Sequence, residues 1–286
     1  MEPTLVSFPA GTLSGDGEVL VVDPAAGVVV VDATPFHPVD HIGRDQPGDA
    51  GVIRAGDVVL TVAEAVMAAV SDEGVLAVGS EIPVKRGVDG WTWLVGHRLD
   101  DASAAGAVEV GASVALEVDA ALRAGLSRGH TACHLASLAL DRALADLWRK
   151  DPGEDALGNP NFEARANQSS RIHPDGSVDD YRLGKSLRKA GFDTEGFAAT
   201  LADREAQINA QLAAWVASGA ASRVVAEGTS IVDRRRWECD LPEQQASMLC
   251  GGTHVASLGE FDSITVALDL NDPQLLVMST TVVPAG

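Results

Sequence analysis

Gly129-His130-Thr131-Ala132-Cys133-His134 is the stretch at which the sequence changes from β-type to helical patterning. From His130 onward, leucines recur at helix spacing until Asp151-Pro152-Gly153, which predicts a first long helix between these points. His130 and His134 are four residues apart, so both imidazoles would lie on one face of that helix. The stretch is therefore both the start of a helical region and a candidate pair of metal ligands.

Short β-branched runs bounded by turn residues fill the sequence before this stretch. They lie at residues 19–22, 28–31, 57–62, 91–95 and 114–118. Several short strands at such spacing are typical of a small barrel or sandwich. We therefore predict a β-rich domain over residues 1–110, with the small-residue stretch 102–107 as a weak boundary.

The sequence after the first helix mixes loop, helix and strand signals. Residues 151–180 are rich in Gly, Pro, Asn, Ser and Asp and are expected to form an excursion over the surface. A second helix is expected from Thr194, a candidate N-cap, to Gly219. Strands are expected at residues 223–226, 264–268 and 275–283 and near Trp237.

The predicted fold class is α+β. A small β-barrel-like domain is followed by an α/β domain over residues 111–286, with a mixed sheet and two long helices.

The composition is that of a globular, strongly acidic chain. Of the 286 residues 46% are hydrophobic and 22% are charged, and the net charge is −20. That charge excludes an extended basic surface gripping nucleic acid along its length, but it leaves room for a local basic patch. No uncharged apolar stretch of about 18 residues and no signal segment occur, so no membrane span is expected. Three cysteines are too few for a disulfide framework, which favours a cytoplasmic location.

A second pair of metal-binding residue types occurs in Cys250-Gly251-Gly252-Thr253-His254. The two glycines permit a backbone turn that would bring the thiolate and the imidazole to one point. With His130 and His134 they form a nitrogen and sulfur donor set that suits Zn²⁺ better than Mg²⁺ or Ca²⁺, and we predict one zinc ion per chain. Four protein ligands are also typical of a closed zinc site that only stabilises the fold, so both interpretations stay open.

Other histidines and cysteines are expected to be structural. His37-Pro38-Val39-Asp40-His41 repeats the histidine spacing, but its proline argues against a helix, so we expect a polar loop near a pocket. Cys133 points about a third of a turn away from the histidine pair and is expected to be packed. Cys239 is expected in a strand, while His97 and His173 have no partner in the sequence pattern.

The two ligand pairs, in this order, resemble those of the alanyl-tRNA synthetase editing domain. The resemblance is closest to the free-standing AlaX-type trans-editing proteins and more remote for the threonyl-tRNA synthetase editing domain. Residues 32–38 and 46–51 are similar to a strand and a glycine-rich segment of the family's N-terminal β domain, and residues 118–119 and 255–260 also fit. The sequence departs from the family at His37, where Tyr is usual, and at residues 39–45, where the family has a run of glycines.

The resemblance implies a zinc-dependent hydrolase that cleaves the ester of mischarged tRNA(Ala) in trans. Ser-tRNA(Ala) is the expected substrate, with Gly-tRNA(Ala) as a further candidate. The implied position of Thr34 is one implicated in recognising serine. The polar residues that the matched motifs place near the pocket, and thus our candidate catalytic residues, are Thr34, Gln46, Thr131 and Thr253. Glu260 and Asp240 are candidate general bases by proximity in sequence only.

Transfer RNA is the implied partner, and neither DNA nor a membrane is expected. The best candidate contact strip, with Tyr181 interleaved, consists of Arg165, Arg171, Arg182, Lys185, Arg188 and Lys189, of which the last four are the predicted tRNA-binding residues. Arg234-Arg235-Arg236 is a second. Both could instead be solvated charges among acidic neighbours.

Two alternative functions remain open at this point. One is a zinc hydrolase that cleaves a small ester or amide on the same scaffold, which the acidic surface and the altered loop at residues 37–45 keep open. The other is a non-catalytic binding module with structural zinc.

Overall fold

The computed structural model describes residues 1–43 and 45–286, so Arg44 of the predicted polar loop lies outside the described residues. The described chain divides into two compact units. Unit 1 comprises Met1–Ala124, Val224–Arg235 and Gly251–Thr253, and unit 2 comprises Gly125–Arg223, Arg236–Cys250 and His254–Gly286. The fold is mixed α+β, and none of the helices described is long and apolar enough to cross a membrane.

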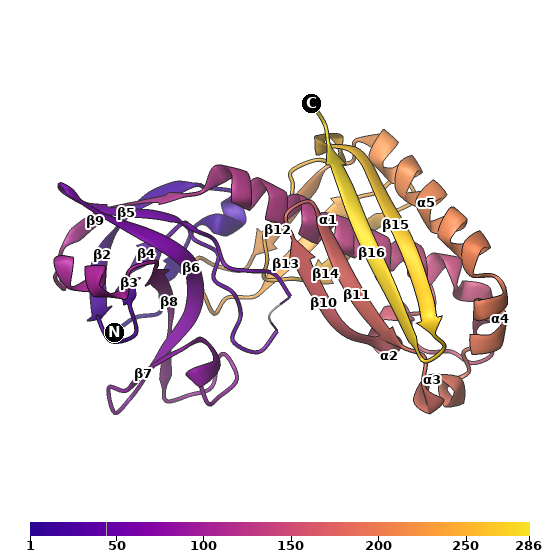
Figure 1. The fold of residues 1–286 in the computed structure, drawn as a ribbon, viewed down its shortest axis with the longest axis horizontal. Coiled ribbons are helices and arrows are strands. Elements are labelled where there is room, and N and C mark those ends of the chain that lie inside the picture. Colours follow the sequence, from indigo (N-terminus) through magenta and orange to yellow (C-terminus); the bar gives the residue numbers. More distant parts are fainter. Residues whose placement is uncertain (44) are drawn as a thin grey trace. The chain divides into compact units, whose positions relative to one another are not determined.

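Unit 1 is built around a closed barrel of six antiparallel strands, drawn in indigo to purple in Figure 1. The strands hydrogen-bond in the order β5-β9-β2-β3-β8-β6, and β6 pairs again with β5 to close the ring. Closure removes the free sheet edges, and apolar residues such as Val19, Ile53 and Val95 form the core. The strands of this unit are β1 (Leu5–Val6), β2 (Ser14–Asp23), β3 (Val28–Val31), β4 (Ala33–Thr34), β5 (Gly51–Ala55), β6 (Val58–Ser71), β7 (Leu76–Val78), β8 (Trp91–Leu99) and β9 (Ser113–Val118).

The barrel extends beyond residue 110, where sequence reasoning placed the domain boundary. Strand β9 lies between β5 and β2, so the ring needs it, and the chain enters unit 2 only at Gly125. The small-residue stretch at residues 102–107 is a short 3₁₀ helix whose Ala105 is fully buried in the barrel core, and it is no boundary.

A later segment of the chain, Val224–Arg235, also belongs to unit 1. The backbone N–H of Val6 donates to the carbonyl of Thr229, and that of Ile231 donates to the carbonyl of Thr4. Ile231 is 1% exposed and packs in the barrel core, so the segment is an integral part of the unit.

Unit 2 contains a four-stranded antiparallel sheet ordered β10-β11-β16-β15, and Figure 1 shows α5 running along it. A separate three-stranded sheet has the order β12-β13-β14, in which the residues of β12 from Val224 on and Arg235 of β13 are counted with unit 1. The helices are α1 (Ala120–Ala143), α2 (Glu163–Ala166), α3 (Lys185–Ala190), α4 (Thr194–Ala199) and α5 (Leu201–Ser218). The strands are β10 (Asn167–His173), β11 (Gly176–Arg182), β12 (Ser222–Ala226), β13 (Arg235–Asp240), β14 (Gln245–Leu249), β15 (Phe261–Asp272) and β16 (Leu275–Pro284).

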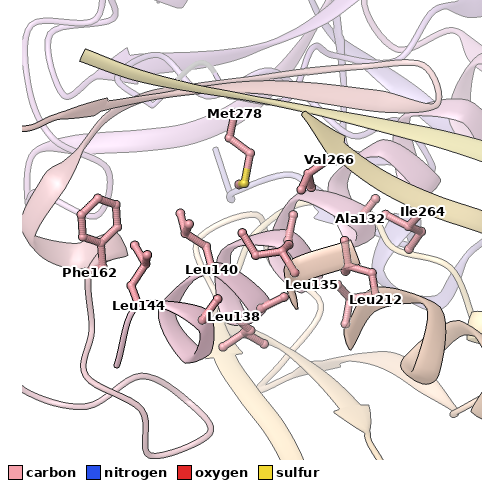
Figure 2. Packing of buried hydrophobic residues seen from close by; sticks show 14 of the residues in the cluster. Ala132, Leu135, Leu138, Leu140, Leu144, Phe162, Leu212, Ile264, Val266 and Met278 are labelled. Atoms are coloured by element: carbon pink, nitrogen blue, oxygen red, sulfur yellow. The ribbon is translucent and has the colours of Figure 1, made fainter. Parts of the chain in front are cut away.

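The core of unit 2 lies between its two long helices and the four-stranded sheet. Figure 2 shows Leu135 of α1, Leu212 of α5 and Val266 of β15 in one buried cluster. Because the helices bury leucines at helix spacing against alternate residues of the strands, α1 is held firmly on the sheet.

The four-stranded sheet is antiparallel, whereas sequence reasoning had expected a mixed sheet, and three further predictions for this unit need correction. The first helix begins at Ala120 rather than near His130. The second helix is interrupted at Thr200, and the residue that caps α4 is Asp193, whose carboxylate accepts the N–H of Gly196. Gly219 ends α5 with a φ of 60°, as predicted.

The third correction concerns the expected surface excursion at residues 151–180. Its second half forms α2, β10 and most of β11, and β11 lies inside the four-stranded sheet. Ile172 of β10 and Tyr181 of β11 are buried. The polar composition of this segment therefore predicted a surface loop where the chain forms a hairpin that packs in the core.

Candidate metal centre

Helix α1 carries the first ligand pair close to the turn between β10 and β11. A Cβ atom at Gly129 would lie 2.4 Å from the carbonyl oxygen of His173 and 2.7 Å from that of Gly176. Glycine therefore lets the helix approach the hairpin at this point. His130 and His134 follow on one helix face, with their ring centroids 4.7 Å apart.

The second pair lies just after β14, where Cys250 and His254 flank the turn Gly251-Gly252-Thr253. The sulfur of Cys250 lies 3.4 Å from Nε2 of His130 and 3.4 Å from Nε2 of His134. It lies 3.2 Å from Nε2 of His254. The four ligand atoms lie within 4.8 Å of one another, so the structure brings the two pairs together.

These distances fit donor atoms around a tetrahedral zinc ion. Bonds of about 2.1 Å to nitrogen and about 2.3 Å to sulfur place the two donors about 3.6 Å apart at the tetrahedral angle. Burial lowers the pKa of His134 to about 4, so its imidazole is neutral at pH 7 and offers a lone pair. The group can hold a metal ion, and three nitrogens with one sulfur favour zinc over hard cations.

A buried tryptophan stands beside the ligands. The ring centroid of Trp237 lies 5.2 Å from that of His134 and 5.5 Å from that of His254. Its indole N–H donates to the Ser222 hydroxyl, which satisfies its polar atom. The indole ring thus covers one side of both imidazoles.

Thr131 is the candidate catalytic residue that lies against a ligand. Its hydroxyl oxygen is 3.1 Å from Nδ1 of His254, 2.8 Å from the carbonyl of Ser127 and 3.2 Å from the N–H of Val255. The side chain is fully buried.

Gln46 and Thr253 bind each other within unit 1. The Gln46 amide donates to the Thr253 hydroxyl at 2.9 Å, and its oxygen accepts the Thr253 N–H at 3.1 Å. Two residues after Gln46, a Cβ atom at Gly48 would lie 1.8 Å from the carbonyl oxygen of Ala65, so glycine lets this segment press against β6. The two predicted residues thus meet, and Thr253 is held directly beside the ligand His254 in sequence.

Thr34 is buried in the barrel unit and is bound to a histidine that sequence reasoning treated as background. His97 Nδ1 lies 3.0 Å from the carbonyl of Val29, which can only accept, so Nδ1 carries the hydrogen. The Thr34 hydroxyl therefore donates to His97 Nε2 at 2.9 Å and accepts the N–H of Phe36. That Thr34 contacts a substrate stays a prediction.

The described residues of the loop after Thr34 form no helix, as expected from Pro38. His37 and His41 are buried rather than open to solvent, and burial lowers the pKa of His37 to about 4. The backbone N–H of His37 donates to Asp49, whose carboxylate also pairs with the buried Arg123. The loop is thus anchored inside unit 1.

The two candidate general bases have structural partners. Glu260 accepts the backbone N–H groups of Ala256 and Ser257 in a capping box. Asp240 pairs with Arg223, which holds the pKa of its carboxyl below the usual range. Both carboxylates are engaged in local structure.

The cysteines outside the centre are buried; Cys133 was expected to be packed and Cys239 to lie in a strand. Cys239 lies in β13, and burial raises the pKa of its thiol to about 12. Cys133 donates to the buried carboxylate of Asp179 at 3.4 Å.

The predicted basic strip extends from α2 and β10 to the end of β11 and α3. Helix α1 lies along β11, with Gly129 against Gly176 and Cys133 bonded to Asp179, so Arg182 is three residues, roughly 10 Å at about 3.3 Å per residue, beyond the Cys133 contact. Its cations are exposed, whereas Tyr181 is fully buried and cannot take part in a surface contact. In the second strip, Arg235 is buried over the Phe8 ring.

Sequence reasoning missed a group of buried acids in unit 2. Asp141 is 1% exposed and accepts the N–H groups of Phe162 and Glu163. Burial raises the pKa of Asp141 to about 8 and that of Glu163 to about 7. Only the position of Asp141 among the leucines of α1 could have signalled its burial.

A scan against models of known protein families found no match for this chain.

Proposed function

We propose that this protein is a zinc-dependent aminoacyl-tRNA deacylase that hydrolyses mischarged tRNA(Ala) in trans. The single observation that carries the proposal is the convergence of His130, His134, Cys250 and His254, the residues on which the resemblance to the AlaX-type editing proteins rests. Under the proposal, the barrel unit corresponds to the family's N-terminal β domain and unit 2 to its editing domain. Ser-tRNA(Ala) is the first substrate, Gly-tRNA(Ala) is a further candidate, and the protein acts in the cytoplasm.

A zinc ion held by the four ligands would supply Lewis-acid polarisation of the ester carbonyl. The chain's own residues orient that site. Gln46 fixes the turn that carries Thr253, and Thr131 contacts His254. Thr34, with its hydrogen donated to His97, offers only a lone pair to a ligand and would accept a hydrogen bond from a substrate hydroxyl.

The exposed cations near α3 are proposed to contact phosphates of tRNA. Their exposure supports this assignment, since a phosphate contact needs cations that are open to solvent. Phosphate contacts of this kind need only a local positive field and weaken as salt is raised.

A structural zinc site is the second candidate, because four protein donors already complete a tetrahedron. In that case zinc would stabilise unit 2 without turnover. The two candidates differ in the effect of removing the metal. A zinc-dependent deacylase would lose its activity, whereas a protein with structural zinc would lose only stability.

The deciding experiment is deacylation of Ser-, Gly- and Ala-tRNA(Ala) by the purified protein. We expect metal-dependent release of serine, with Ala-tRNA(Ala) spared, and at least a hundredfold loss after chelation or in Cys250→Ala. Cys239→Ala is the matched control, because that cysteine is buried in β13 and is not one of the four ligands.

Three outcomes would revise the proposal. Hydrolysis of small esters but not of charged tRNA would favour the small-ester hydrolase. A folded, zinc-loaded protein that releases no amino acid and cleaves no ester would favour structural zinc. Serine release that is unchanged by chelation would remove the metal from the reaction.

A further inference from the structure

Thr131 is a fully buried hydroxyl that touches a ligand from the other pair. It lies on α1 one residue after His130, and its oxygen is 3.1 Å from Nδ1 of His254. Its other two neighbours are the carbonyl of Ser127 at 2.8 Å and the N–H of Val255 at 3.2 Å.

The chemistry of these neighbours determines the direction of each hydrogen bond. A hydroxyl has one hydrogen to donate and two lone pairs to accept with. The carbonyl of Ser127 can only accept, so it takes the hydrogen, and the N–H of Val255 can only donate, so it fills one lone pair. The second lone pair of Thr131 is then satisfied only if Nδ1 of His254 carries a hydrogen.

In the neutral imidazole, the form that binds a metal, a hydrogen on Nδ1 leaves the other ring nitrogen of His254 without one. Nε2 is the nitrogen that lies 3.2 Å from the Cys250 sulfur and belongs to the group of four ligand atoms. Its lone pair therefore faces the other donors, as metal binding requires.

We propose that Thr131 is a positioning residue that fixes the tautomer and the ring orientation of His254 for metal binding. Its role is to hold a ligand in place through the Nδ1–H bond and not to contact substrate. The sequence had placed it among the candidate catalytic residues. The inference rests on metal binding at the four ligands and is independent of which ester is cleaved.

The test compares the zinc affinity of the full chain with that of Thr131→Val and Thr131→Ser. Valine has nearly the shape of threonine and removes only the hydroxyl, whereas serine keeps it. With a chromophoric chelator as competitor, we expect Thr131→Val to bind zinc about 10–100-fold more weakly and Thr131→Ser to stay within about threefold of the original protein.

Thr200→Val is the matched control. Thr200 makes the same kind of bond, from its hydroxyl to the carbonyl four residues back at Gly196, and its other partners are Phe197 and Arg204. The zinc affinity of the Thr200→Val variant should equal that of the unmodified chain. Equal zinc affinity for Thr131→Val and the unmodified chain, with both folded, would overturn the proposal.

Nuclear magnetic resonance of the unmodified chain gives a readout that does not depend on any variant folding at position 131. In ¹⁵N-histidine spectra of the zinc-loaded protein, we expect His254 to show a hydrogen on Nδ1 and metal on Nε2, the signal being assigned through its loss in His254→Gln. The reverse pattern would contradict the role of Thr131. Neither measurement uses a tRNA substrate. The role of Thr131 can therefore be confirmed or overturned separately from the deacylase proposal.

Discussion

Two acids of unit 2 lie in buried surroundings and form no ion pair with the described residues. Asp141 makes hydrogen bonds to two backbone N–H groups through one oxygen, yet burial still raises its pKa to about 8. Glu163, next to this site, has a pKa raised to about 7 for the same reason. Folding therefore favours the protonated carboxyls, whereas the unfolded chain releases those protons near pH 4.

The pH dependence of stability follows from this difference. Because the pKa of Asp141 is raised in the folded state, its stabilising contribution is full below about pH 4 and is lost as pH rises towards 8. We expect Asp141→Asn, whose amide oxygen can still accept both N–H groups, to stabilise the protein at pH 8 relative to the unmodified chain. Urea unfolding at pH 5 and pH 8 would measure it.

Asp146→Asn provides a control whose effect on stability should not change between pH 5 and pH 8. Its hydrogen bonds to Arg204 lower the pKa of Asp146, so the stabilisation it gives is lost as pH falls rather than as pH rises. An Asp141→Asn difference that does not grow between pH 5 and pH 8 would show that this carboxyl is ionised in the folded protein.

Single residues also show what sequence could and could not predict about the site. The group of four candidate ligands could be predicted because histidine and cysteine at these spacings are typical metal donors. The bonds of Thr131 and His97 could not, since both depend on the direction of a hydrogen bond to a partner distant in sequence. His97 looked isolated for this reason.

At the scale of elements, the start of helix α1 is determined by its N-cap residue and not by the first leucine of its apolar pattern. The leucine spacing predicted a start near His130, whereas the Asp119 carboxylate accepts the N–H groups of Ala121 and Leu122 and starts the helix ten residues earlier. The N-cap aspartate was readable from sequence. The β10–β11 hairpin was not, because its residues are polar and its core contacts come from β16 and α2.

The cap of α1 can be tested by substitution. Asp119→Ala removes the acceptor for two N–H groups and should lower the free energy of unfolding by about 1 kcal/mol, while Asp119→Asn should retain most of it. Urea denaturation followed by circular dichroism measures both variants. Equal stability of the alanine and asparagine variants would mean that solvent replaces the cap without loss.

The exposed cations of α3 give a second prediction at the scale of elements. Charge reversal at Lys185, Arg188 and Lys189 of α3 should weaken tRNA binding at least tenfold at low salt, because three phosphate contacts become repulsions. The control that keeps the positive charge is Lys→Arg at Lys185 and Lys189. Unchanged affinity in a filter-binding assay would show that these charges are only solvated.

At the scale of the whole molecule, the chain passes between its two units five times. It enters unit 2 at Gly125, returns at Val224, leaves after Arg235, returns at Gly251 and leaves again at His254. Composition and turn signals predicted a single boundary, because a short returning segment has no signature that separates it from a loop. The long-range pairing of Val6 and Thr229 is what reveals it.

Truncation tests this arrangement. A fragment of residues 1–124 lacks Thr229 and Ile231, so backbone groups of Thr4 and Val6 lose their partners and the barrel core is exposed where Ile231 packs. We expect the fragment to unfold at a lower temperature than the barrel in the full chain, and to regain stability when a peptide of residues 224–235 is added. If the fragment unfolded cooperatively at the temperature of the full chain, with or without the peptide, residues 224–235 would not be needed for a stable barrel.

The segments that return to unit 1 also restrict how the gene can recombine without disrupting the fold. Recombination moves contiguous stretches of a gene, and the residues that complete the barrel are encoded after more than half of the residues that make unit 2. A crossover within the intervening sequence would separate the barrel from its own Ile231, and one between Cys250 and His254 would divide the ligand pair. The two units are therefore expected to have been inherited together, with substitutions in Val224–Arg235 tracking those in β1.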